Sequence, residues 1–564
     1  LTKTGLRGNG LLDWNEATLA SRDFSFQTMN LSADTAALDI KSTGDKVTFK
    51  TPNVNAKVDF KTRIGDFVSN QKNIPTEFAY NQYTTAINEF KWYMDEKILD
   101  FKAPVDGKGE YFTSTKPEQK GLKFLGKRAT YNLVTSILRV EQVPEIRVAD
   151  AAVVPDSGVV VIEEGAAMRQ LKNAVIIADT AQRYHRINKA TVDILSINEL
   201  KGVGQTMYTT KTVAPQVVNF EDIHCKTETI GEKKDKQTIW KLTATGEMPI
   251  TQNFQLYPNV NFHGEIGLLS TRQYMNFKGY SKIGLKHTGV NTSDFFINQE
   301  VNPADFKLKF DTTNNSNGNR VYTGIFINPA ETTGPYALLM APKNNNSDVP
   351  LFMAAGIITD NKNGEYVFGT EKRIKDGAPK GNILRYDDTK GIVKADGLMN
   401  LGTRFGIIKT KAAGTAEVDL DSNTYKFNLT FGIDLKVDDK MQEKLETYMA
   451  QDNIDLPDID YGTEKFKNVL NQLANPKDDK KLLEEFDKTG VFKRTKDLTH
   501  NFVFTDVNFV YDTGDITLRS VGKIGVAFVG KKAIHKKLDG WMEFGYRNGM
   551  DVFNIYLKTG TNEW

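Results

Sequence analysis

The sequence of 564 residues is poor in cysteine and in charge of one sign. Its single cysteine, Cys225, excludes an internal disulfide and is a poor start for a structural zinc site. Its 73 Lys and Arg residues balance 71 Asp and Glu residues, which leaves a net charge of +2. Because proteins that hold a nucleic-acid backbone usually carry a basic excess, we expect no nucleic-acid partner.

Long apolar runs are missing too. No stretch reaches the roughly 18 apolar residues that a membrane-spanning helix needs, so we expect no transmembrane helix in this segment. The chain starts at Leu1 instead of Met and has no signal-peptide pattern there. We therefore expect a processed protein or an interior fragment of a longer one.

The common motifs of catalysis and cofactor binding are absent from the sequence. It contains no G-x-G-x-x-G or G-x-x-x-x-G-K-[ST], which cradle phosphates, and no H-E-x-x-H, which binds zinc. Gly279–Gly284 has one residue too many for a nucleophile elbow, so we interpret Ser281 as an ordinary strand serine. The six histidines are dispersed along the chain. We expect a protein that is not an enzyme and has no cofactor or metal.

Three weaker patterns suggest cation binding. His224 precedes Cys225, but adjacency lacks the spacing that chelation favours. Asp419–Asn423 begins like a calcium loop, yet positions 6 and 12 of that loop are threonines, so we interpret it as a hairpin turn. The acidic loop 455–460 is typical of a solvated linker.

Strict alternation of apolar and polar residues is the dominant pattern. It runs through 54–61 and through 425–437. In the second stretch every odd-numbered residue is apolar and every even-numbered residue is polar or glycine. A strand places successive side chains on opposite faces, so these stretches predict half-buried strands, the second of them about 40 Å long. The residues of the predicted apolar face line either a closed core or an open groove: Val54, Val58, Phe60, Phe427, Phe431 and Ile433.

Turn residues and helical periodicity complete the pattern. Pro155–Gly158 separates two valine-rich runs and is typical of a hairpin turn. Apolar residues spaced three and four apart are concentrated between 438 and 492. They predict a small helical insertion that covers one end or edge of a sheet.

Several stretches resemble OstA-like repeats. The resemblance starts at Ala129–Asn132, passes through Ile146–Ala151 and Asn173–Asp179, and continues from Lys189–Val192 to Leu200–Gly204. Such repeats build the lipopolysaccharide-transport bridge proteins, and the resemblance implies their open β-jellyroll, which carries acyl chains in its groove. It supplies no catalytic residue.

More broadly, the chain resembles large, mostly uncharacterised cell-envelope β-repeat proteins of Bacteroidota. The stretches that carry this likeness include Asp59–Gly65, Glu89–Asp95 and Gly549–Phe553. The likeness implies a cell-envelope location, in the periplasm or associated with the outer membrane. The helical insertion departs from a simple bridge repeat and interrupts the path that lipid would follow.

We therefore expect a mainly β protein, with an elongated, stacked antiparallel sheet of jellyroll- or taco-like repeats and a small helical insertion. Four regions are predicted: an OstA-like β-repeat region at 1–215, a second antiparallel β region at 216–437, the insertion at 438–492, and a C-terminal β region at 493–564 that continues the preceding sheet.

The expected function is that of a non-enzymatic cell-envelope scaffold or accessory protein. It would bind an outer-membrane or secretion-associated partner through a long β-sheet surface, within a larger assembly of envelope proteins. One alternative is a lipid or lipopolysaccharide transfer bridge with an apolar groove. Another is a carbohydrate-binding or carbohydrate-acting surface protein, with Trp14, Trp240 and Trp541 as candidates for stacking on sugars.

Overall fold

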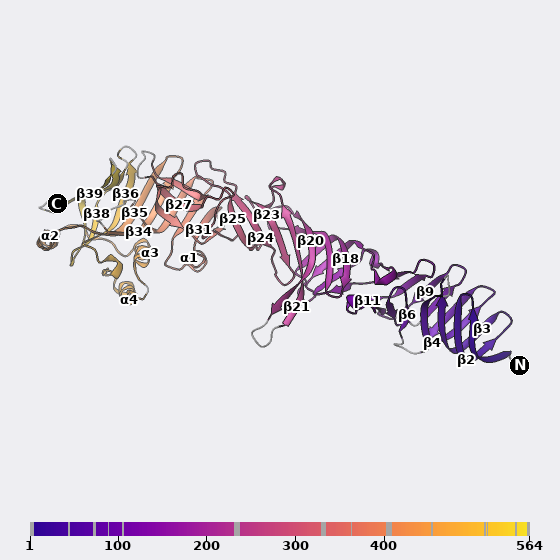
Figure 1. The fold of residues 1–564 in the computed structure, drawn as a ribbon. Coiled ribbons are helices and arrows are strands. Elements are labelled where there is room, and N and C mark those ends of the chain that lie inside the picture. Colours follow the sequence, from indigo (N-terminus) through magenta and orange to yellow (C-terminus); the bar gives the residue numbers. More distant parts are fainter. Residues whose placement is uncertain are drawn as a thin grey trace. The chain divides into compact units, whose positions relative to one another are not determined.

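In a computed structural model the chain is mainly β, with large antiparallel sheets and a few short helices (Figure 1). This confirms the predicted fold class and the helices between 438 and 492. The structure describes residues 5–42, 46–70, 75–87, 89–103, 107–230, 237–328, 334–361, 364–401, 409–452, 455–475, 477–512, 515, 517–547 and 550–560.

The chain divides into two units. Unit 1 comprises Leu1–Thr209, Ala214–Pro249 and Glu265–Phe277. Unit 2 comprises Thr210–Val213, Ile250–Gly264 and Lys278–Trp564. The boundary between the units falls inside β23 and inside β24, so each of these two strands contributes residues to both units.

Unit 1 is built from antiparallel strands rich in the β-branched and aromatic residues that favour a half-buried sheet. They are β1 (Leu6–Trp14), β2 (Ala17–Phe26), β3 (Asn30–Lys41), β4 (Val47–Asp59), β5 (Ile64–Ser69), β6 (Thr76–Phe78), β7 (Tyr83–Thr85), β8 (Glu89–Tyr93), β9 (Ile98–Lys102), β10 (Glu110–Ser114), β11 (Lys123–Gly126), β12 (Arg128–Asn132), β13 (Ile137–Glu141), β14 (Ile146–Val148), β15 (Ala151–Val154), β16 (Val160–Ile162), β17 (Leu171–Ala178), β18 (His185–Ser196), β19 (Glu199–Tyr208), β20 (Gln216–Ile230) and β21 (Gln237–Met248).

The strands of unit 1 separate into two rows at β4. Residues Val54–Asp59 of β4 pair with β5, whereas Phe49 and Lys50 of the same strand pair with β6. Row A then continues through β5, β8, β9, β12, β13 and β16. Row B continues through β6, β7, β10, β11, β14, β15 and β17. Successive hairpins therefore alternate between the rows.

Aromatic side chains fill the space between the two rows. Phe78 of row B lies with its ring centroid 5.4 Å from Phe101 and 5.1 Å from Tyr131, both in row A. Phe49 of β4 lies 5.6 Å from Phe78 and 5.2 Å from Phe90 of row A. All five side chains are buried. The interior of this part of unit 1 is therefore a packed aromatic core.

One local prediction is corrected by the row arrangement. Pro155–Gly158 joins β15 to β16, but β15 pairs with β14 and β17, while β16 pairs with β13. The two valine-rich runs thus lie in different rows, and the turn carries the chain from one row to the other instead of closing a hairpin.

Unit 2 contains the remaining strands, including its parts of β23 and β24. They are β22 (Gln255–Tyr257), β23 (Val260–Leu269), β24 (Asn276–Ile283), β25 (Phe295–Glu300), β26 (Leu308–Lys309), β27 (Tyr322–Ile327), β28 (Tyr336–Ala341), β29 (Val349–Ala354), β30 (Ile357–Asp360), β31 (Glu365–Gly369), β32 (Ile383–Asp387), β33 (Ile392–Met399), β34 (Lys409–Asp419), β35 (Thr424–Asp434), β36 (Phe502–Asp512), β37 (Thr517–Val521), β38 (Ile524–Val529), β39 (Lys532–Arg547) and β40 (Met550–Lys558).

The described residues of unit 2 include the α-helices α1 (Glu371–Lys375), α2 (Asp439–Asp452), α3 (Glu464–Leu473) and α4 (Lys480–Thr489). The Thr463 side chain caps α3 by accepting a hydrogen bond from the backbone N–H of Phe466. Gly490, with φ of +66°, ends α4 in the left-handed conformation that glycine adopts without strain.

The helices cover a face of the sheet, which corrects the expected position at an end or edge. Leu470 and Leu473 of α3 belong to one buried cluster with Val503 of β36 and Ala527 of β38. Because the helices lie on this face, β38 is buried on both of its faces. In the second half of β35, too, consecutive residues are buried instead of alternating between buried and exposed.

Candidate functional site

The strand edge at β1 is the first candidate binding surface. β1 pairs with β2 from Leu6 opposite Phe26 to Trp14 opposite Ala17, with a break in register between Gly8 and Gly10. It contacts no other strand extensively in the described part of the chain. The backbone groups on its other side therefore face outward. Such an edge is a template for a strand from another chain.

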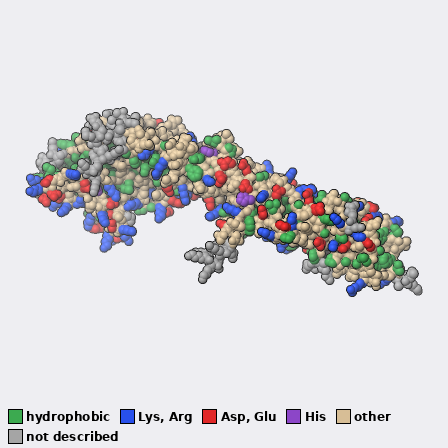
Figure 2. Space-filling view, in the orientation of Figure 1, with side chains coloured by type: hydrophobic (Ala, Val, Ile, Leu, Met, Phe, Trp, Pro, Cys, Tyr) green, Lys and Arg blue, Asp and Glu red, His purple; other side chains and the backbone are tan. Residues whose placement is uncertain are grey.

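The side chains of β1 make this edge partly apolar. Leu6 is 51% exposed and Leu11 is 66% exposed. Trp14 holds the strand in place, because its ring lies 6.2 Å from Trp92 and 6.0 Å from Phe60. Figure 2 shows hydrophobic side chains at the surface of this N-terminal region, among charged groups of both signs.

A row of polar side chains starts at this edge and crosses the outer face of unit 1. In register, Arg7 lies opposite Ser25, Ser25 opposite Ser32, and Ser32 opposite Lys57. The row continues from Lys57 to Asp66, Lys91 and Asp100 on successive strands. Opposite charges on neighbouring strands attract each other, so the row favours this register.

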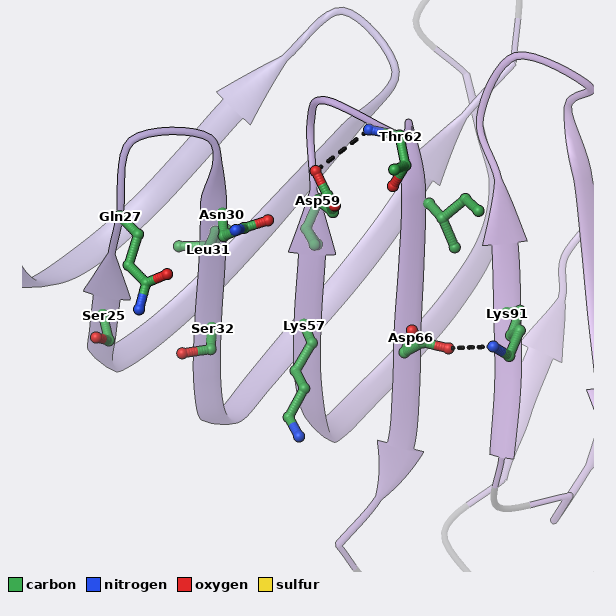
Figure 3. A pocket seen from close by; sticks show the side chains of 12 residues that line it. Ser25, Gln27, Asn30, Leu31, Ser32, Lys57, Asp59, Thr62, Asp66 and Lys91 are labelled. Carbon is green, nitrogen blue, oxygen red and sulfur yellow. Dashed lines mark hydrogen bonds and ion pairs between the residues drawn. The ribbon is translucent and has the colours of Figure 1, made fainter.

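Part of the row lines a shallow polar groove of about 470 Å³ (Figure 3). Lys91 and Asp66 form an ion pair across it, with Nζ and Oδ1 3.1 Å apart. At one end of the groove Asp59 accepts hydrogen bonds from the backbone N–H groups of Lys61 and Thr62, which lower the pKa of its carboxyl. The groove reaches the strand next to the β1 edge, because Ser25 of β2, which lies opposite Arg7, is part of its lining.

The predicted apolar face consists of residues from both units, and its members are mostly buried. Val54 and Val58 of unit 1 are at most 2% exposed, whereas Phe60 is half-buried against Trp14. In unit 2, the ring of Phe431 lies 5.2 Å from Phe504. Phe427 and Ile433 are buried as well. Of these residues, Phe60 and Phe431 therefore have aromatic side chains of the protein as neighbours.

The candidate catalytic and thiol residues are engaged in the sheet. Ser281 is fully buried, and its hydroxyl donates to the carbonyl of Asn261 at 3.0 Å. Burial raises the pKa of the Cys225 thiol to about 12, so the thiol is unreactive at neutral pH. The Nδ1 atom of His224 lies 3.0 Å from Oδ1 of Asp222, on the same strand. Within the described residues no group of three or more His, Cys, Asp or Glu could hold a metal ion.

The acidic patterns serve local structure. Asp419 accepts hydrogen bonds from the backbone N–H groups of Asp421 and Ser422, which close the turn between β34 and β35 and lower the pKa of Asp419. This confirms the hairpin turn. In the acidic loop, Asp458 forms an ion pair with Lys536 at 2.7 Å, so this segment is attached to β39 and is not a free linker.

The three tryptophans proposed for sugar stacking differ in exposure. Trp14 packs between other aromatic rings, and Trp240 is half-buried with Lys120 Nζ 5.9 Å from its ring centroid. Trp541 of β39 is 43% exposed. Trp14 is thereby excluded as an open platform.

Sequence patterns did not identify the β1 edge. The signal that could have found it is composition, because Gly8, Asn9 and Gly10 weaken a strand interior and are more typical of an edge or a bulge. The structure places a break in register between Gly8 and Gly10.

Comparison with known proteins gives no match, either to a family model or to a curated protein. Among the described residues, no helix has the length and apolar character needed to cross a membrane.

Proposed function

We propose that the protein is a non-catalytic scaffold of the cell envelope, which binds a protein partner by accepting one of the partner's strands at β1. The observation that carries this proposal is the outward-facing side of β1, which has β2 as its only extensive strand contact among the described residues. Strand addition supplies affinity through main-chain hydrogen bonds and specificity through alternate side chains.

The side chains near the edge favour a partner strand with apolar residues. Leu6 and Leu11 are each more than half exposed, and an added strand would remove them from water. Burying apolar area contributes about 25 cal/mol per Å². On the outer face, Arg7 forms a loose ion pair with Asp23 at 3.8 Å, and a partner carboxylate opposite Arg7 would continue the charged row.

The packed interior of unit 1 favours the scaffold over the lipid bridge. A bridge needs an apolar groove that acyl chains can enter. Between row A and row B the rings of Phe78, Phe101 and Tyr131 already occupy the interior. The cell-envelope location and the outer-membrane or secretion-associated partner rest on the sequence resemblance, and they remain part of the proposal.

The experiment is site-specific photo-crosslinking from β1 in cells that produce the protein. A crosslinking residue replaces Asn9, which is exposed. We expect a crosslink to one discrete envelope protein that is lost when Leu11→Asp is added. The matched control is Leu195→Asp on β18, where the leucine is 41% exposed but lies within the sheet, and it should keep the crosslink.

Two results would count against the proposal. One is the absence of any crosslink from Asn9 when the protein is folded and in its native compartment. The other is a crosslink that Leu11→Asp and Leu195→Asp weaken equally, because that would show a loss of folding or location and no role for the edge.

A further inference from the structure

A second groove lies on unit 2 and shares no residue with the proposed strand-addition site. It encloses about 380 Å³. One side is formed by the start of β23 and the end of β24, and the other by the loop segments 292–294 and 315–317. Its principal polar side chains are those of Asn253, Asn261, His263, Lys282, Asp294 and Asn317.

The loop walls are held in place by hydrogen bonds. Asn315 is 4% exposed, and its Oδ1 accepts from the backbone N–H of Asn319 at 2.9 Å. The hydroxyl of Thr313 donates to the carbonyl of Phe296 at 2.6 Å, which ties the loop to β25. Ser293 donates its N–H to Met340 at 3.0 Å, which ties the other wall to β28. A groove with fixed walls loses little entropy when it binds a ligand.

Aromatic rings form a platform beside the groove. The ring of His263, which lines the groove, is stacked on Tyr280 with centroids 5.6 Å apart and planes 25° apart. Phe296 of β25 meets Tyr280 edge-on, also at 5.6 Å, and is 38% exposed. The three rings come from three strands and extend from the groove across the outer face of the sheet. His263 and Tyr280 are half-buried and Phe296 is exposed, so the platform offers a ring face and a ring edge to the C–H face of a sugar.

The amide groups in the groove are available to a ligand. Among the described residues, the side chains of Asn253, Asn261 and Asn317 have no hydrogen-bond partner in the protein. Each amide has two N–H donors and a carbonyl acceptor, a combination that suits neighbouring hydroxyl groups, which both donate and accept. Lys282 and Asp294 contribute one charge of each sign, so the groove favours an uncharged ligand.

We propose that this groove binds a neutral oligosaccharide, with one sugar on the Tyr280 platform and its neighbour among the asparagine amides. A few convergent polar groups beside an apolar surface are the usual composition of a ligand site. The site gives the protein a glycan-binding activity that goes beyond the proposed scaffold function and does not depend on it. It uses none of the three tryptophans that the sequence suggested for sugar stacking.

The test is binding of the purified full chain to an array of neutral and acidic oligosaccharides, followed by calorimetric titration of the strongest neutral one. We expect binding that is insensitive to added NaCl, since a neutral sugar makes no ion pairs. Tyr280→Ala and Asn317→Ala should each weaken it by about tenfold or more. Asn317 is exposed in its loop, so its replacement leaves the fold intact. Tyr111→Ala, at a tyrosine that is 49% exposed on β10, is the matched control and should bind normally.

Three outcomes would overturn the proposal. The first is no binding to any neutral oligosaccharide on the array. The second is binding that neither Tyr280→Ala nor Asn317→Ala reduces. The third is binding confined to acidic sugars and lost as NaCl is added, because that would indicate an ionic surface and no groove for neutral sugars.

Discussion

The ring of Tyr131 in β12 meets that of Phe78 in β6 edge-on, with centroids 5.1 Å apart and an interplanar angle of 66°. The two strands belong to different rows of unit 1, and both side chains are fully buried. This contact joins the two rows beside the hydrogen bonds that the Asn81 side chain, in the turn after β6, donates to the carbonyls of Ser136 and Ile162 of the other row. It shows that the rows are held together by an aromatic core, and this core leads to the first prediction.

Phe78→Ala should destabilise unit 1 by about 3–5 kcal/mol, because it leaves a cavity between the rows and removes several ring contacts. Urea unfolding followed by tryptophan fluorescence measures the change. Val134→Ala is the control, since Val134 is 63% exposed and should change stability by less than about 0.5 kcal/mol. A Phe78→Ala protein as stable as the control would show that the space between the rows is not a packed core.

Asp150→Ala should also destabilise unit 1, by about 1–3 kcal/mol. The Asp150 carboxylate accepts from the N–H of Leu242 at 2.8 Å and from the hydroxyl of Ser270 at 2.5 Å, and both donors would lose their partner. Asp34 lies between small residues as Asp150 does, in Ala33-Asp34-Thr35-Ala36 against Ala149-Asp150-Ala151-Ala152, but it is exposed in β3 and has a weak contact to Asn55 at 3.3 Å. Asp34→Ala should therefore be nearly neutral, and equal unfolding midpoints for the two variants would refute the role of Asp150.

Acidification should destabilise unit 2 through His535. Burial lowers the pKa of this histidine in the folded state, where its Nδ1 lies 2.7 Å from the hydroxyl of Tyr461. The unfolded chain takes up a proton near pH 6.5, the ordinary value for histidine, before the folded protein does. The contribution of His535 to stability is therefore present above about pH 6.5 and is lost as the pH falls below it.

The measurement compares unfolding midpoints at pH 7.5 and pH 5.5 for the unchanged protein and for His535→Asn. Asparagine keeps an acceptor near the position of Nδ1 and does not titrate, so the variant should lose less stability on acidification. His224→Asn replaces a more exposed histidine of unit 1 and should leave the pH dependence of unit 2 unchanged. If His535→Asn loses as much stability as the unchanged protein, another group causes the effect.

Alternation in the sequence was enough to predict the strands but not their partners. The pattern at 425–437 corresponds to β35, which ends at Asp434, and the pattern at 54–61 corresponds to the second half of β4 and the two residues after it. Pairing depends on contacts between distant residues, as Phe78 and Tyr131 illustrate, and a local turn such as Pro155–Gly158 does not reveal them.

The candidate sites were harder to predict because they depend on what lies beside a residue and not on its type. β1 is an edge because β2 pairs with one of its sides and the other side is left open, and this pairing is not visible in the sequence. The composition of β1 alone predicts only a weak strand. The groove on unit 2 joins β23 and β24 to loop residues such as Asn317, which follow much later in the chain. The acidic turn at Asp419, by contrast, was predictable because its hydrogen bonds are local.

Hydrogen exchange on the native envelope assembly, compared with the purified chain, tests the central claim most directly. If a partner strand is added at β1, the backbone N–H groups of Leu6–Trp14 that face away from β2 should exchange at least about tenfold more slowly in the assembly. The inner strands β2 and β3 should change little. Equal exchange of the β1 amides in the two samples would contradict the account.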